Sequence, residues 1–145
     1  MNFSIFSGLI TLDLWDKQLF RCDWDDGQRP LFYTGSSVVI LCFGIDNPGS
    51  LLDVKEVWMP EVRLYTQAPI LLVGCKMDIR TDTVVLEKMR TRYEDMEPVS
   101  VQQGRDMAKS IGASMYLECS ANTGEGVDEV FHHAARLSLQ AKTLL

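Results

Sequence analysis

Two short polar segments contain the residues whose types and spacing indicate the clearest chemistry. Lys76 and Asp78 follow the apolar run PILLVG, and Ser120 and Ala121 follow the shorter run MYLE. An aspartate at a strand end can accept two parallel N–H bonds from the edge of a guanine, which adenine cannot donate. A lysine can lay its stem on a base face, and a Ser-Ala turn leaves backbone N–H groups near a ring carbonyl. The two segments together predict a site that reads guanine.

Apolar runs of strand length precede both segments and must position them. Three runs have the composition of strands buried on both faces of a parallel sheet, at 38–43, 69–74 and 115–118, and a further strand is predicted at 9–14. Strands that alternate with helices predict an α/β fold with a mostly parallel sheet. Ligands bind such sheets outside the carboxyl ends of the strands. The loops after Phe43, Gly74 and Glu118 are therefore expected to meet.

Four stretches have helical spacing, at 46–65, 83–95, 100–111 and 126–141. Pro60 falls inside the first of them, and we expect a kink or break there because proline lacks a backbone donor. Ser100 begins the third, with Gln103 placed to complete a capping box. Gly112 is expected to end that helix.

Length and composition limit the classes of protein that the sequence can encode. The 145 residues, 46% of them hydrophobic, predict a single domain over 1–145. The net charge of −6 argues against nucleic acid as a partner. No apolar stretch reaches the roughly 20 residues that span a bilayer, and no signal peptide is recognisable, so a cytoplasmic location is expected.

The four cysteines are Cys22, Cys42, Cys75 and Cys119, and none has the spacing of a metal-ligand pair. Cys42 and Cys75 lie in or beside apolar runs. We therefore expect buried, reduced thiols in place of a disulfide framework.

Several longer segments resemble the Rho family of small GTPases within the Ras superfamily. They are RPLFY at 29–33, WMPEV at 58–62, ILLVGCKMDIR at 70–80, EPVSVQQGRDMAKSIGA at 97–113 and YLECSANTGEGVDEVFHHAAR at 116–136. The predicted helix at 83–95 stands where Rho proteins carry an inserted helix. The resemblance covers roughly residues 9 to 140. It implies a partial P-loop-NTPase-like fold, binding of GTP or GDP with Mg²⁺, Rho regulators or effectors as protein partners, and signalling to the actin cytoskeleton.

The resemblance assigns the residues of the guanine site one by one. Lys76 and Asp78 match the base-reading lysine and aspartate, and Ser120 and Ala121 match the last base-binding loop. Cys75 departs from the family, which has Asn or Thr there, and Asn122 replaces the usual Lys. Because Cys75 lacks the side-chain hydrogen bond that braces this loop, a looser base pocket is expected.

The phosphate-binding parts of the family pattern are not found in the printed sequence. No GxxxxGK[ST] string occurs, and the threonine of the first switch has no counterpart. The resemblance therefore implies that the chain begins near the third strand of the family fold, without the first two strands and the phosphate loop. Base contacts alone predict an affinity near the millimolar level, about −4 kcal/mol. Without the family's first strand, the strands at 9–14 and 38–43 are expected to pair directly or to leave unpaired edges that favour self-association.

The stretch LWDKQLFRCDWDDGQRPL at 14–31 occupies the place of the family's catalytic switch, which reads WDTAGQE. Asp16 is the weak candidate for a magnesium ligand, and Gln28 is the one candidate remnant of the catalytic glutamine. No single alignment of this stretch restores the aspartate, glycine and glutamine together. Beyond these two candidates we therefore assign no catalytic residue and no metal ligand, and we expect this chain to lack the GTP hydrolysis of the family.

Three hypotheses of function remain open at this point. The chain is a Rho-type GTPase homologue in GTP-dependent signalling, a nucleotide-free pseudo-GTPase that acts as an interaction module, or an incomplete isoform without independent activity. The ending AKTLL has no CaaX cysteine, so a stable membrane anchor on this chain is not expected.

Overall fold

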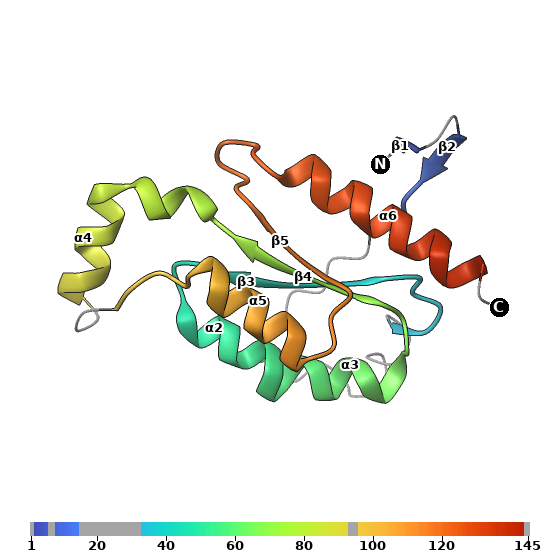
Figure 1. The fold of residues 1–145 in the computed structure, drawn as a ribbon, viewed down its shortest axis with the longest axis horizontal. Coiled ribbons are helices and arrows are strands. Elements are labelled where there is room, and N and C mark those ends of the chain that lie inside the picture. Colours follow the sequence, from blue (N-terminus) through green and yellow to red (C-terminus); the bar gives the residue numbers. More distant parts are fainter. Residues whose placement is uncertain (1, 6–7, 15–32, 93–95, 144–145) are drawn as a thin grey trace, which may run out of the picture.

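The computed structural model describes residues 2–5, 8–14, 33–92 and 96–143. The strands among them form two separate sheets. Strands β1 (Asn2–Ile5) and β2 (Gly8–Thr11) make an antiparallel hairpin. Strands β3 (Val39–Gly44), β4 (Ile70–Cys75) and β5 (Met115–Cys119) make a parallel sheet in the order β3-β4-β5 (Figure 1). The predicted α/β architecture with a parallel sheet flanked by helices is confirmed.

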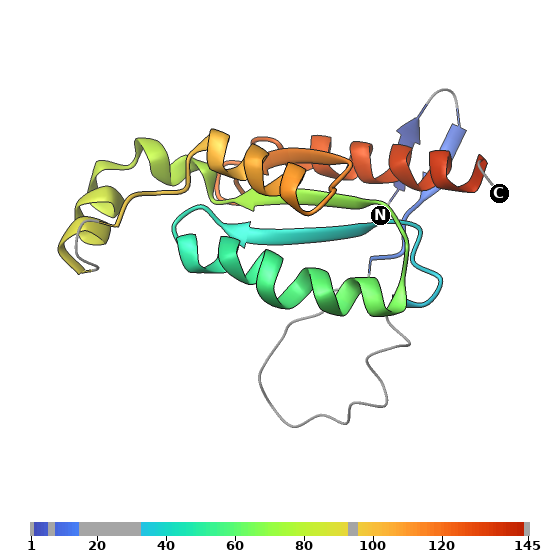
Figure 2. The same ribbon diagram turned by 60° about the horizontal axis from the view of Figure 1, so that its bottom comes forward.

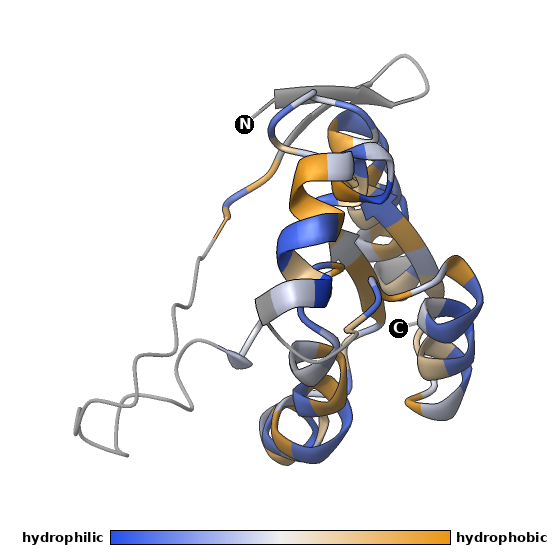
Figure 3. Cartoon of the chain, turned by 90° about the vertical axis from the view of Figure 1, so that its left-hand side faces the viewer, coloured by the Kyte–Doolittle hydropathy of each residue, from blue (hydrophilic) through white to orange (hydrophobic). Residues whose placement is uncertain are grey.

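Helices cover the two faces of the parallel sheet (Figure 2). Helix α6 (Val127–Thr143) packs on one face. The other face carries α2 (Pro48–Asp53), the π-helical segment η1 (Val54–Trp58), α3 (Met59–Tyr65) and α5 (Val101–Ser110). In Figure 3 the helices carry both hydrophilic and hydrophobic residues, as expected where one side packs on a sheet.

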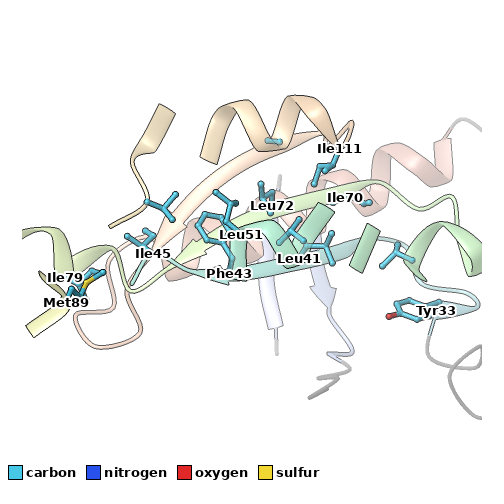
Figure 4. Close-up of a cluster of buried hydrophobic side chains, with 14 residues drawn as sticks. Tyr33, Leu41, Phe43, Ile45, Leu51, Ile70, Leu72, Ile79, Met89 and Ile111 are labelled. Atoms are coloured by element: carbon cyan, nitrogen blue, oxygen red, sulfur yellow. The ribbon is translucent and has the colours of Figure 1, made fainter. Parts of the chain in front are cut away.

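Strand β4 lies between β3 and β5. Its side chains contribute to two clusters of buried hydrophobic residues, one on each face of the parallel sheet. Ile70 and Leu72 are fully buried among the side chains of α2, η1, α3 and α5 (Figure 4). Leu71 and Val73 are buried on the opposite face, against Val130 and Ala134 of α6. Successive strand residues point to opposite faces, so a continuous apolar run is what a strand covered on both sides requires.

The helix that contains Pro60 does not break there. The backbone N–H of Met59 bonds to the carbonyl of Val54, five residues back, and α3 begins at Met59 with Pro60 in its first turn. A wider turn before the proline removes the need for the N–H that proline lacks, and position N1 or N2 of a helix tolerates that loss. The expected break is therefore replaced by one π-helical turn.

The other helical predictions agree with the structure. Helix α4 covers Thr83–Arg92, and a short 3₁₀ segment, η2 (Met77–Thr81), precedes it. Ser100 and Gln103 form the predicted capping box at the start of α5, and Gly112 has φ +66° just after its end. Within the described ranges, no helix has the length and apolar character needed to cross a membrane.

The N-terminal part of the chain differs from the sequence prediction. A single strand was expected at 9–14, whereas β2 ends at Thr11 and pairs with the earlier strand β1. In the described ladders β2 does not pair with β3, so β3 stands at the edge of the parallel sheet. Direct pairing of these two strands, one of the two expected arrangements, is therefore not found.

The expectation of buried thiols is wrong for Cys42. Its side chain is exposed, whereas Cys75 and Cys119 are half-buried beside the α6 cluster. Cys22 lies outside the described residues.

Candidate functional site

The carboxyl ends of the three parallel strands bring the predicted loops together. The register pairs Gly44 with Cys75 and Cys75 with Cys119, so the three strands end side by side. The ladder continues one step further, because the Ile45 N–H donates to the Cys75 carbonyl at 2.9 Å. This edge therefore juxtaposes the loops that contain Asp46, Lys76 to Asp78, and Ser120 to Asn122.

The loop after β4 turns at Lys76, which has φ +65° and ψ +40°. This left-handed conformation is uncommon for a residue with a Cβ atom, and surrounding contacts must hold it. The Lys76 ammonium donates to Asp46 Oδ2 at 2.6 Å. Both side chains are partly exposed, so the pair fixes where the lysine lies more than it adds to stability.

Asp78 directs its carboxylate toward the loop that follows β5. The amide Nδ2 of Asn122 donates to Asp78 Oδ2 at 3.3 Å. A hydrogen bond from the Ser120 side chain is the main cause that lowers the pKa of the Asp78 carboxyl. The other oxygen, Oδ1, is covered from solvent and has no hydrogen-bond partner in the chain. A covered acceptor without a partner is costly, and a ligand N–H would satisfy it.

The loop after β5 is a tight turn built around Ser120, which is fully buried. The Ser120 hydroxyl accepts from the Thr123 N–H at 3.1 Å, and the Ser120 carbonyl accepts from the Gly124 N–H at 2.8 Å. Gly126 has φ +74°, and a Cβ atom there would lie 2.3 Å from the Glu118 carbonyl oxygen. Ala121 is exposed at the outer side of this turn.

A bidentate ion pair braces the two loops from behind, and the sequence reasoning missed it. Arg80 donates to both carboxylate oxygens of Glu118, at 2.5 and 2.8 Å, and also to the Val99 carbonyl at 2.6 Å. The Tyr116 hydroxyl donates to the same carboxylate at 2.5 Å. The available signal was proximity, because Arg80 and Glu118 each lie two residues from a predicted base contact.

The electrostatics of this brace follow from its partial burial. Burial on its own would raise the pKa of Glu118, but the hydrogen bonds from Arg80 and Tyr116 outweigh it and lower that pKa. The same Glu118 hydrogen bond raises the pKa of Arg80. The pair is therefore ionised at neutral pH, and it ties η2 to β5.

The side chain of Cys75 lies on the face of the sheet that packs against α6. Its pKa is raised, first by a hydrogen bond with Cys42 and then by burial. Burial raises the pKa of the neighbouring Cys119 to about 11. Both groups are thiols at neutral pH, and Cys75 does not supply the loop brace that an asparagine side chain would.

The remaining predicted residues lie elsewhere. Asp16 and Gln28 fall outside the described residues. Within the described ranges, no group of three or more His, Cys, Asp or Glu side chains is arranged to hold a metal ion. The structure thus brings together Lys76, Asp78, Ser120, Ala121 and Asn122.

Comparison with known proteins gives one consistent result. A family model described as "Ras family" matches residues 4–140. The chain is 47% identical over 135 residues to the GTP-binding protein RHO1 of Saccharomyces cerevisiae. The aligned region covers 92% of this chain and 63% of that protein. RHO1 of Candida albicans is 46% identical over 92% of this chain and 66% of its own length. The chain thus spans a little under two thirds of these relatives.

Proposed function

The chain belongs to the Ras family, as a Rho-type small GTPase, and from that premise we propose that its loops after β4 and β5 bind the base of a guanine nucleotide. One observation carries the proposal. Asp78 Oδ1 is covered from solvent and lacks a partner, at the position where a base edge with two N–H groups would donate.

The neighbouring groups complete a base pocket in this proposal. The stem of Lys76 is held by the contact of its ammonium with Asp46, so its methylene groups can lie along one face of the base. The turn that begins at the buried Ser120 carries the exposed Ala121, whose backbone suits the ring carbonyl of guanine. Adenine carries an amine in place of that carbonyl, and it has no N1–H to donate to Asp78.

Phosphate and Mg²⁺ are a separate matter from the base. When bound, Mg²⁺ would supply positive charge that stabilises the phosphates of the nucleotide. The described residues do not fit such an ion, since they hold no suitable group of ligands, and the printed sequence has no GxxxxGK[ST] string. We therefore derive no hydrolytic step and propose that this chain binds GTP or GDP weakly, near the millimolar level.

In the wider proposal the chain takes part in GTP-dependent signalling through protein regulators or effectors, with the actin cytoskeleton as its downstream target. Its support is the similarity to proteins described as GTP-binding. The catalytic role of Gln28 and the magnesium role of Asp16 remain hypotheses within this proposal.

A second candidate, a nucleotide-free interaction module, is favoured by the outer surface of α2, η1 and α3. Leu52, Val57 and Leu64 are 61%, 46% and 77% exposed along this one helical stretch. Exposed apolar side chains of this kind are available for contact with a partner protein. In this alternative the helices bind a Rho partner whether or not a nucleotide is bound.

A nucleotide titration distinguishes the two candidates. Amide chemical shifts of the isotopically labelled chain are followed while GDP or ADP is added to several millimolar. The base-binding proposal predicts saturable shifts at Lys76, Asp78 and Ala121 with GDP and a clear preference over ADP. Equal responses to the two nucleotides, or none, contradict base reading and leave the interaction module.

A further inference from the structure

The two positions that depart from the family pattern lie at the end of β4 and in the loop after β5. Cys75 ends β4 and directs its thiol toward Cys42 and Cys119, so it gives the base loop no side-chain hydrogen bond. Asn122 lies in the loop after β5 and donates from Nδ2 to Asp78 Oδ2. Cys75 thus lacks the side-chain hydrogen bond that would support the loop after β4, whereas Asn122 adds a hydrogen bond between the loops after β4 and β5.

The bond to Oδ2 determines what Oδ1 can do. The terminal torsion of an aspartate is broad, so a carboxylate held at neither oxygen turns easily. The Ser120 side chain also hydrogen-bonds this carboxylate, and the Asn122 amide adds a contact at Oδ2. With the carboxylate held in this way, Oδ1 stays in its covered position without a partner. The nearby cation does not compete for this role, because the Lys76 ammonium is paired with Asp46.

We propose that Asn122 is a positioning residue for guanine recognition, which holds Asp78 Oδ2 so that Oδ1 accepts from the base, and which replaces the brace that Cys75 does not provide. The proposal rests on the base-binding function proposed above. It concerns how strongly and how selectively the base is read, and Asn122 itself need not touch the base.

The test compares Asn122→Ala with the unchanged chain in titrations with GDP, IDP and ADP. Inosine keeps the N1–H and the ring carbonyl of guanine but lacks the exocyclic amine, so the GDP to IDP ratio reports two-point recognition by Asp78. Removal of Asn122 should weaken GDP binding about three- to tenfold, the range for one hydrogen bond. It should also reduce the GDP to IDP ratio, which a general loss of stability would not do selectively.

A matched control comes from helix α5. Gln102 donates from Nε2 to Asp106 Oδ1 at 2.8 Å, which is also an amide-to-carboxylate bond on the surface. Gln102→Ala should leave GDP affinity and the GDP to IDP ratio unchanged. An Asn122→Ala variant that behaves like this control would overturn the proposal.

A second readout needs no nucleotide. The Asp78 carboxyl is followed by NMR across a pH titration in the unchanged chain and in both variants. Asn122→Ala should raise the pKa of Asp78 toward its ordinary value, and Gln102→Ala should not. An unchanged Asp78 titration overturns the positioning role. If the unchanged chain fails to prefer GDP while this shift is seen, the base-binding function is wrong and the loop contact stands.

The replacement of the missing brace is tested by a double-mutant cycle. Cys75→Asn restores the family side chain at the end of β4. If Asn122 replaces that brace, Asn122→Ala should weaken GDP binding less in the Cys75→Asn background than in the unchanged chain. Strictly additive effects on affinity overturn this part of the proposal.

Discussion

The carboxyl end of the parallel sheet and the β3 edge of the same sheet are built from the same three strands, yet they differ sharply in the contacts they make. At the carboxyl end, Arg80, Glu118 and Tyr116 form one connected set of hydrogen bonds behind the base loops. Along the edge, β3 pairs only with β4 in the described sheets and exposes Cys42. The comparison indicates that the loops after β4 and β5 are supported by contacts of their own, apart from the β3 edge.

Among the changes that test this comparison, Glu118→Ala is expected to have the largest effect on the free energy of unfolding. The variant leaves the Arg80 guanidinium partly buried without its carboxylate, and it removes the acceptor of Tyr116. Loss of one partner of such a pair is expected to lower the free energy of unfolding by about 3 kcal/mol. Chemical denaturation measures this loss, and a change under about 1 kcal/mol would contradict the bracing role.

A smaller effect is expected from pH through the same carboxylate. Because the pKa of Glu118 is lowered in the folded chain, its contribution to stability is present above the ordinary glutamate pKa of 4.5. That contribution is lost as the pH falls through the folded value. The urea midpoint should therefore fall more steeply below pH 4.5 in the unchanged chain than in Glu118→Gln. Parallel pH profiles for the two chains would contradict this assignment.

The smallest effect on stability is expected at the β3 edge. Cys42→Lys changes an exposed side chain and should alter the free energy of unfolding by under about 0.5 kcal/mol. The same lysine places a charge on a strand that, among the described strands, pairs on one side only, and such a charge discourages pairing with another chain. Sedimentation velocity should therefore show less self-association for Cys42→Lys than for the unchanged chain. An unchanged chain that stays monomeric at all concentrations would contradict the role of this edge.

Sequence patterns predicted the parts of the molecule that depend on local periodicity and short motifs. The three parallel strands, the capping box at Ser100 and the convergence of Lys76 and Asp78 with Ser120 all follow from the order of apolar runs and from parallel topology. The predicted burial holds along β4 only, because β5 is half-buried and β3 exposes Cys42. The roles of those residues in binding remain predictions.

The features that the sequence did not predict depend on contacts between distant segments. The Arg80 and Glu118 pair requires η2 to lie beside β5, and the Lys76 and Asp46 pair requires the register of β3 against β4. Apolar periodicity does not specify which polar side chains face each other across strands. The π-helical turn before Pro60 was missed for a different reason, since proline can be accommodated by a wider turn as well as by a break.

The proposed function and the proposed role of Asn122 both depend on whether the loops after β4 and β5 bind guanine selectively. The decisive measurement is the preference of the chain for GDP over ADP, compared between the unchanged chain and Asp78→Asn, which replaces one carboxylate oxygen by an amide donor. If the loops read guanine, the unchanged chain should prefer GDP and the variant should lose this preference. Equal affinity of the unchanged chain for both nucleotides, or an undiminished preference in Asp78→Asn, would contradict the central claim.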